Sequence, residues 1–478
     1  MDLQLTKKEF KILLLIILLA LFVSIIFLNS SAIKDWDETV YANLGYDLSK
    51  NPLEYSFSKN GWSDRVPDES WPKAGFRAPL LPYILSLFYF LKLDFMVIYI
   101  IPLISALSIL IVFYLGKLMF DKKVGIYSAV LFTFIPLNVL MSSKIMTDSL
   151  STFFVLLSIL FFWKGYELKI KKYKILFGLF LALSLLSRYS VLWIMPIFPI
   201  YLIIRDKSLK FIKDKELVYS LGLFFIILVP WFIYGLSEYN NILGPFLHGL
   251  KAATYWGSTE PWYFFFQNSW EMFSIVSIIF LLSLISVFFN KDFKRKEIYF
   301  LLLWVFIFLL MAMTMAHKEQ RFILQIVPAI CLISAFFIRQ FKYSEIVIFF
   351  IIIILSFSLI SQFQYYHSLT YREDTLCFTK AGYFLENKSN SFVISDQSTL
   401  GYYYFKKKMT YFPDPWDLEK LKNKIDHQPE KEVYLFYTKF NTPDNENYRL
   451  MEKDLNLNFK VVFKCPENES SSIIYQYR

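Results

Sequence analysis

The 478-residue chain has few of the residues on which several kinds of protein depend. It contains only 3 cysteines and 4 histidines, and these are not arranged in closely spaced pairs, which argues against a structural zinc site or a disulfide framework. Among its 14 glycines there is no P-loop, no dinucleotide-binding turn and no nucleophile elbow. Nucleotide hydrolysis is therefore not expected.

Apolar residues are abundant instead. They make up 56% of the chain, and 52 residues are phenylalanine. They fall in runs of roughly 15 to 25 residues, the length that a helix needs to cross about 30 Å of hydrocarbon. The net charge of +10 comes from Lys and Arg at the ends of these runs and not from one basic face. We therefore expect a polytopic α-helical membrane protein that does not bind nucleic acid.

About twelve apolar runs are candidates for membrane spans, and the distribution of the basic loops indicates which of them cross the membrane. If residues 78–92 crossed the membrane, the later basic loops would all lie opposite the basic N-terminus, against the positive-inside bias. This run is also short, and Pro79 and Pro82 lie near its start. We therefore predict an interfacial or re-entrant helix there and about eleven spans, at 11–28, 97–116, 124–141, 149–163, 175–187, 189–204, 217–236, 270–290, 298–316, 322–338 and 345–362.

This topology places the N-terminus in the cytoplasm and the C-terminal segment outside it. The predicted domains are a membrane domain over residues 1–362 and a small extracytoplasmic α/β domain over residues 363–478. In the latter, Cys377 and Cys465 could pair in an oxidising compartment, although the sequence alone does not give the geometry. The expected helices are 375–387 and 416–425, and the expected strands are 392–395, 432–438, 459–463 and 473–477.

The first predicted outer loop carries an acidic cluster just after the first span. Asp37 and Glu38, with Tyr41 one turn further, could supply a general base for a hydroxyl or ligands for a divalent cation. The alternative is a helix start, with Asp37 as the N-cap and Glu38 in the first turn.

Two further outer segments carry charge next to the membrane. Lys73 and Arg77 precede the interfacial helix, where a guanidinium could bind a lipid phosphate or simply snorkel to the surface. Asp148 stands at the start of a span, where a carboxylate is costly unless it has a function or caps the helix.

The densest polar cluster is the hexamer His317–Phe322, which lies between two predicted spans. His317, Lys318, Glu319 and Arg321 bring mixed charges together, and these suit a phosphate-sugar leaving group beside a proton-handling residue. Arg188 and His248, in other outer turns, could join the same cavity or be structural.

At these residues the chain resembles the GT-C superfamily of membrane glycosyltransferases, which take a sugar from a polyprenyl-phosphate carrier. Asp37, Glu38 and Tyr41 are similar to the first-loop acidic motif of its protein mannosyltransferase-like and aminoarabinose transferase-like members. The segment Phe76–Leu80 stands where those relatives carry a basic residue and prolines, and Thr147-Asp148 stands where they carry a second acidic motif. The hexamer resembles the His-Lys-Glu-x-Arg-Phe signature of mannosyltransferases that use dolichyl-phosphate-mannose.

The resemblance implies an inverting transferase that moves a hexose to a lipid-linked, protein or envelope glycan acceptor at the outer face of the cell membrane. Mannose is the sugar that we expect. It implies Asp37 as the base, supported by Glu38, and Asp148 as the residue that orients the acceptor or a metal. It implies that Arg77, Lys318 and Arg321, with Lys73 and His317, hold the donor phosphate, and that Tyr41, Glu319, Arg188 and His248 support them. The resemblance indicates no particular cofactor, although Asp37, Glu38 or Asp148 could bind a divalent cation.

A transporter or lipid-glycan flippase is the alternative function. Such a protein would place ionisable residues at mid-membrane, often in two repeated halves. In this chain the ionisable residues stand at span ends instead.

Overall fold

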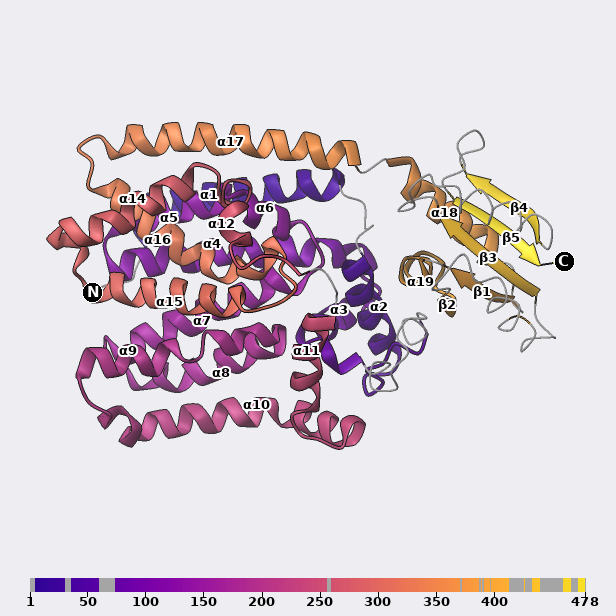
Figure 1. Cartoon of the computed structure of the whole chain (residues 1–478), viewed down its shortest axis with the longest axis horizontal. Coiled ribbons are helices and arrows are strands. Elements are labelled where there is room, and N and C mark those ends of the chain that lie inside the picture. The colour runs from indigo at the N-terminus through magenta and orange to yellow at the C-terminus, as the bar shows by residue number, and fades with distance from the viewer. Residues whose placement is uncertain are drawn as a thin grey trace. The chain divides into compact units, whose positions relative to one another are not determined.

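A computed structural model describes residues 5–30, 36–59, 74–255, 259–369, 372–386, 388, 391–395, 397–411, 425, 432–438, 459–465 and 472–477. The chain divides into two compact units (Figure 1). The helical unit comprises Met1–Asn29, Phe76–Leu81 and Ile98–Tyr366. The mixed unit comprises Ser30–Gly75, Pro82–Val97 and His367–Arg478.

The helical unit is a bundle in which α10 runs along one edge and α17 along another (Figure 1). Short 3-10 helices at Tyr189–Trp193 and Gln320–Ile326 precede α9 and α16. The described α-helices of the bundle are α1 (Lys7–Ser30), α4 (Ile100–Met119), α5 (Lys122–Phe134), α6 (Pro136–Ser142), α7 (Thr147–Tyr166), α8 (Lys171–Ser187), α9 (Ile197–Asp206), α10 (Lys215–Tyr239), α11 (Gly244–Tyr255), α12 (Phe264–Gln267), α13 (Ser269–Phe273), α14 (Ile275–Phe289), α15 (Lys296–Met313), α16 (Val327–Arg339) and α17 (Ser344–Leu369).

The bundle confirms that the chain is an integral, multi-pass membrane protein. In the described part of the chain, 8 helical segments are long and apolar enough to cross a membrane, and the bent pair α5 and α6 would make 9. These coincide with predicted spans. The predicted spans 175–187 and 270–290 correspond to α8, with 17 residues, and α14, with 15 residues, so the number eleven stays a prediction. Residues 78–92 contain the 11-residue helix α3 (Leu80–Phe90), which at 1.5 Å per residue is about 17 Å long, too short to span.

Small residues allow the spanning helices to approach one another closely, as is usual in membranes. A Cβ atom at Gly116 of α4 would lie 2.7 Å from the Cα atom of Gly125 in α5. One at Gly178 of α8 would lie 2.0 Å from the carbonyl oxygen of Ser220 in α10. A larger residue at either glycine would push the helices apart.

Ion pairs join the loops that we predict to be cytoplasmic. Glu9 accepts from Lys117 at 3.2 Å, and Glu167 pairs with Arg205 at 2.7 Å. Arg339 pairs with Asp121 at 3.1 Å. The first of these pairs brings the N-terminal end of α1 to the last turn of α4, in agreement with the predicted shared side. The orientation in the membrane stays a prediction.

The mixed unit contains a five-stranded sheet of the described strands, in the order β2-β1-β3-β5-β4. β1 pairs in parallel with β2 and β3, whereas β5 pairs antiparallel with β3 and β4. Apolar side chains are buried on both faces of the sheet. The elements of this unit are α2 (Trp36–Lys50), most of α3, α18 (Arg372–Glu386), β1 (Ser391–Ser395), α19 (Ser398–Phe405), β2 (Met409–Tyr411), β3 (Glu432–Thr438), β4 (Phe459–Cys465) and β5 (Ser472–Tyr477).

The small α/β fold and its four expected strands are confirmed, as is the helix expected at 375–387. Helix α19 and strand β2 were not predicted. The sequence of α19 contains three consecutive tyrosines, which have a higher strand than helix propensity, and β2 has only 3 residues. The helix expected at 416–425 lies outside the described residues except for Ile425.

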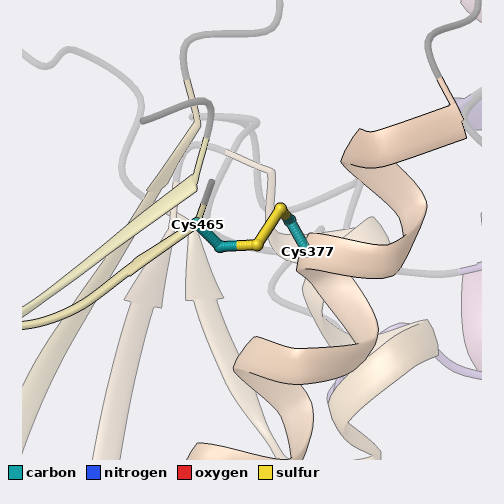
Figure 2. The surroundings of a disulfide bond; sticks show 2 residues. All are labelled: Cys377 and Cys465. Carbon is teal, nitrogen blue, oxygen red and sulfur yellow. A yellow bond between two sulfur atoms is a disulfide. The ribbon is translucent and has the colours of Figure 1, made fainter. Parts of the chain in front are cut away.

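A disulfide joins Cys377 of α18 to Cys465 at the end of β4 (Figure 2). The two Cα atoms are 5.4 Å apart, and 88 positions separate the residues in the sequence. The fold therefore places the two cysteines at a distance that allows a disulfide, which the sequence alone could not show.

Replacing both cysteines, in Cys377→Ala/Cys465→Ala, is expected to destabilise the mixed unit. Closing so long a loop limits the unfolded chain and is worth about 4–5 kcal/mol on a chain-entropy estimate. Urea unfolding of the purified full chain, followed by protease sensitivity of the mixed unit, measures the loss. Reductant should lower the stability of the wild type and leave the double variant unchanged; a wild type that is insensitive to reductant contradicts the prediction.

Candidate functional site

A buried ion pair lies where α7 begins and α8 ends. Arg188 is the C-cap of α8, and its Nη1 atom is 2.7 Å from Oδ1 of Asp148 in the first turn of α7. Asp148 is 1% exposed, so its charge depends on this guanidinium and on the positive end of the α7 dipole. Asp148 is not the N-cap, because α7 is capped at Met146 without a side-chain hydrogen bond.

The hexamer forms a second ion pair within itself. Arg321 donates from Nη2 to Oε1 of Glu319 at 2.9 Å, and its Nε lies 2.6 Å from Oε2 of the same carboxylate. His317 Nε2 is 3.0 Å from Glu319 Oε1. Arg321 also contacts the sulfur of Met146 at 2.8 Å. Since Met146 precedes Thr147-Asp148, the fold brings the second acidic motif and the hexamer together.

The ring of Phe322 connects the two ion pairs. The guanidinium carbons of Arg188 and Arg321 lie 5.3 and 6.0 Å from its centroid, and the His317 ring lies 5.8 Å from it. Cations are attracted to the face of such a ring. The arrangement collects two guanidinium groups and an imidazole around one aromatic side chain, with Asp148 and Glu319 as their counter-charges.

A buried hydrogen bond fixes the segment that follows the hexamer. Gln325, in the 3-10 helix Gln320–Ile326, donates from Nε2 to Oγ of Ser151 in α7 at 2.7 Å. Both side chains are fully buried. Arg321 and Phe322 belong to the same 3-10 helix, so this contact positions them against the start of α7.

Lys318 has other partners than Arg321. The residue is 5% exposed, and its ammonium donates to the backbone carbonyls of Glu260 at 2.8 Å and Met315 at 2.5 Å. The amide of Glu260 in turn donates to the carbonyl of Ala316 at 3.0 Å. These contacts do not test the role of Lys318 at the donor phosphate, which stays a prediction. They do show that Lys318 supplies donors to two backbone carbonyls, and such groups need partners.

Lys318→Met is therefore expected to act mainly through stability. It leaves two carbonyls without their donor, which costs about 1–3 kcal/mol. Thermal unfolding of the purified chain should show a lower midpoint, with a smaller loss of activity than a substitution at Arg321. Lys123→Met removes an exposed lysine paired with Glu345 and serves as the control. A Lys318 variant of unchanged midpoint that has lost all activity would contradict this role.

Tyr189 connects Arg77 to the same region. Its hydroxyl donates to the carbonyl oxygen of Arg77 at 3.5 Å and accepts from Nε1 of Trp231 in α10 at 2.9 Å. A Cβ atom at Gly249 of α11 would lie 2.4 Å from the Tyr189 ring, so only glycine allows α11 to pack here. Tyr189 follows Arg188 directly, so the residue next to the Asp148–Arg188 pair hydrogen-bonds to the backbone of Arg77.

The remaining predicted residues of the helical unit and the first loop have different surroundings. His248 of α11 contacts Tyr239, with 4.6 Å between the ring centroids and 40° between the ring planes. Asp37 and Glu38 are in the first turn of α2, which begins at Trp36, so Asp37 is not the N-cap that we considered. Tyr41 follows on the same helix and is buried. Lys73 lies outside the described residues.

The donor set gives little support to a metal site. In the described ranges, no group of three or more His, Cys, Asp or Glu side chains could hold a metal ion. The Asp148 carboxylate is paired with a guanidinium. The divalent cation stays a prediction, and no step below depends on it.

The chain is similar in fold to ArnT and to an archaeal oligosaccharyltransferase, and the predicted resemblance to the GT-C superfamily is confirmed at the level of the fold. Its residues 76–234 match the sequence profile of the family described as Dolichyl-phosphate-mannose-protein mannosyltransferase. No curated protein shows significant similarity to the sequence.

Several solved structures are similar to this chain in fold. The crystal structure of ArnT from Cupriavidus metallidurans bound to undecaprenyl phosphate superposes with a TM-score of 0.72 and 10% identity, over 97% of each chain. The oligosaccharyltransferase of Archaeoglobus fulgidus in the apo form gives 0.60 and 12%, over 89% of this chain and 69% of that one. The same archaeon's AglB, with an inhibitory peptide and a dolichol-phosphate, gives 0.57 and 13%, over 96% and 74%.

Proposed function

We propose that this protein is a glycosyltransferase that moves a hexose from a polyprenyl-phosphate carrier to an acceptor hydroxyl. The sugar that we propose first is mannose. The observation that carries the proposal is the Arg321 guanidinium, which lies beside Phe322 and next to the acidic start of α7. A guanidinium binds phosphate oxygens through forked donors. The family match over residues 76–234 and the undecaprenyl phosphate bound to the similar ArnT support a lipid phosphate as its ligand.

The proposed reaction is a single displacement with inversion. The acceptor oxygen attacks the anomeric carbon, the bond from that carbon to the phosphate oxygen breaks, and the lipid phosphate leaves with the electron pair. Asp37, with support from Glu38, takes the proton of the hydroxyl. Arg321 and Arg77 stabilise the charge that develops on the phosphate, because fixed cations in a dry site act strongly on such charge. His317 hydrogen-bonds or protonates that phosphate.

The ion pairs suggest separate roles for the other charged residues. Arg188 neutralises Asp148 and keeps its carboxylate at the start of α7, where it can orient the acceptor. Glu319 holds Arg321 by two contacts and so fixes the direction of its guanidinium. We propose that both carboxylates orient the arginines before the donor binds.

The experiment that tests this function uses the purified chain in lipid with labelled polyprenyl-phosphate-mannose and with other polyprenyl-phosphate hexoses. Lipid-linked, peptide and glycan acceptors are offered in separate reactions. Transfer of label with inversion supports the proposal, and the choice of donor identifies the sugar. Failure of the wild type to transfer sugar from any of these donors overturns it, and movement of the intact lipid-linked sugar between leaflets would favour a flippase.

The proposal places the reaction on the outer face of the cell membrane, and cysteine labelling tests this. Cys331 is buried and the other two cysteines are disulfide-bonded, so background labelling should be low. A membrane-impermeant maleimide should label Tyr383→Cys in intact cells and Lys171→Cys only after lysis. Both positions are well exposed. Labelling of both from outside, or the reverse pattern, contradicts the topology.

A further inference from the structure

Helix α2, which carries Asp37 and Glu38, packs against α19 of the C-terminal segment within the mixed unit. The contact is polar and buried. The hydroxyl groups of Thr39 and Thr399 lie 3.2 Å apart, and Nδ2 of Asn43 donates to the carbonyl oxygen of Thr399 at 2.8 Å. These three residues are fully buried.

One turn further along α2, the Tyr402 hydroxyl donates to Oδ1 of Asp47 at 2.5 Å. Asp47 is 5% exposed, and burial raises the pKa of its carboxyl above the usual range. A buried carboxylate needs such a donor, because an unmet buried charge is expensive. The buried carboxylate of Asp47 therefore depends on the hydrogen bond from the Tyr402 hydroxyl.

The C-terminal end of α19 adds a third contact. Lys406 takes the left-handed conformation there, with φ 53°, and ends the helix. Its ammonium lies 4.3 Å from the ring centroid of Tyr46 in α2 and 5.7 Å from that of Tyr89 in α3. Burial among these rings lowers the pKa of Lys406 to about 8. Lys406 thus contacts both first-loop helices.

Helix α3 supports α2 on another side. A Cβ atom at Gly45 would lie 2.7 Å from Cβ of Leu85 and 3.2 Å from the carbonyl oxygen of Pro82. Because Gly45 lacks a side chain, α3 can pack directly on the backbone of α2. The helix is therefore fixed by α19 and α3 together.

The residues of α2 that hydrogen-bond to α19 share one face of the helix. Thr39, Asn43 and Asp47 recur every four residues and share one face of the helix. At 100° per residue, Asp37 and Tyr41 lie about 160° round the helix from Thr39. The same rotation places Asp37 about 120° from Asn43 and about 80° from Asp47, so Asp37 lies to one side of the face that contacts α19.

We propose that the C-terminal α/β segment positions the first-loop helix, with Thr399 and Tyr402 of α19 as positioning residues for Asp37 and Glu38. The inference rests on the proposed function for its catalytic meaning, but not for the contact itself. It gives the C-terminal segment a part in catalysis although none of its residues needs to touch the substrate. Misplacement of a catalytic group by about 1 Å can cost about 100-fold in rate, so such positioning matters.

Three variants of the full-length protein in lipid test it. Tyr402→Phe removes the donor to Asp47 and keeps the ring. Asp47→Asn keeps an acceptor for Tyr402 and removes the buried charge. Tyr383→Phe removes a tyrosine hydroxyl from α18 of the same segment, where the side chain is 67% exposed, and is the matched control.

Amide hydrogen exchange reports the contact independently of activity. In Tyr402→Phe the amides of α2 should exchange about 10-fold faster or more, while β1 and β3 keep their protection. Asp47→Asn and Tyr383→Phe should match the wild type. If α2 keeps its protection in Tyr402→Phe, the contact does not position the helix and the proposal is overturned.

Kinetics then separates positioning from the function itself. With an active wild type, Tyr402→Phe should lower kcat about 10-fold or more and leave KM for the lipid donor unchanged, and Asp47→Asn should retain most of kcat. Faster exchange in α2 with an unchanged kcat overturns the positioning role. A wild type that transfers no sugar overturns the proposed function, whereas the exchange data still decide the contact.

Discussion

Asp37→Asn should lower kcat by at least about 100-fold and leave binding of the lipid-linked donor unchanged. The amide has nearly the same shape but cannot accept the acceptor's proton, and general-base catalysis contributes about 10²–10⁴-fold. The measurement is label transfer at saturating donor, combined with donor affinity from equilibrium binding. Removal of the base alone should affect the chemical step and not the ground-state complex.

Glu54→Gln is the matched control for Asp37→Asn. Glu54 is an acidic residue of the same first-loop segment, and its carboxylate pairs with Lys59 at 3.4 Å at the surface. Its variant should keep the wild-type kcat. If Asp37→Asn also keeps it, the base must be another residue, and Glu38→Gln becomes the next variant to measure.

Arg321→Gln should reduce kcat by about 10²–10³-fold, because it removes a preorganised cation from the leaving phosphate. Arg321→Lys should restore little, since an ammonium cannot reproduce the forked contacts to Glu319 and to a phosphate. The loss should persist at saturating donor. Glu319 is itself 36% exposed, so water can solvate it in the variant and the fold should be retained.

Arg295→Gln is the matched control for this substitution. Arg295 also stacks on phenylalanines, Phe120 and Phe336, and also pairs with a carboxylate, that of Glu297. Its variant should keep full activity. Equal losses in both variants would mean that removing any stacked arginine perturbs the bundle, and the donor-phosphate role of Arg321 would be contradicted.

Arg188 differs from Arg321 in the cost of its removal. Asp148, its partner, is 1% exposed, and an uncompensated charge there would cost several kcal/mol. An Arg188 substitution would therefore mix folding with chemistry, which is why Arg321 is the better residue for a kinetic test.

The site could be predicted from the sequence only in part. The polar residues that interrupt apolar runs at Asp148 and at the hexamer identified the right segments, because charge next to hydrocarbon needs a reason. Their pairing could not be predicted: nothing local indicates that Asp148 would pair with Arg188 or that Phe322 would lie between two arginines. The hydrogen bond of Lys318 to the carbonyl oxygen of Glu260 could not be predicted either, because the two residues are 58 positions apart in the sequence.

The sequence by itself determined the class of this protein. Long apolar runs force helices in lipid, where backbone groups must be satisfied within the chain, and the composition change near residue 363 predicted a separate α/β segment. Only the tertiary structure decided which distant residues meet. It joined Cys377 to Cys465 and Asp148 to Arg188, and it packed α2 on α19 through contacts about 355 residues apart in sequence. Such contacts depend on how whole helices and strands pack, and the local sequence around each residue does not predict its distant partner.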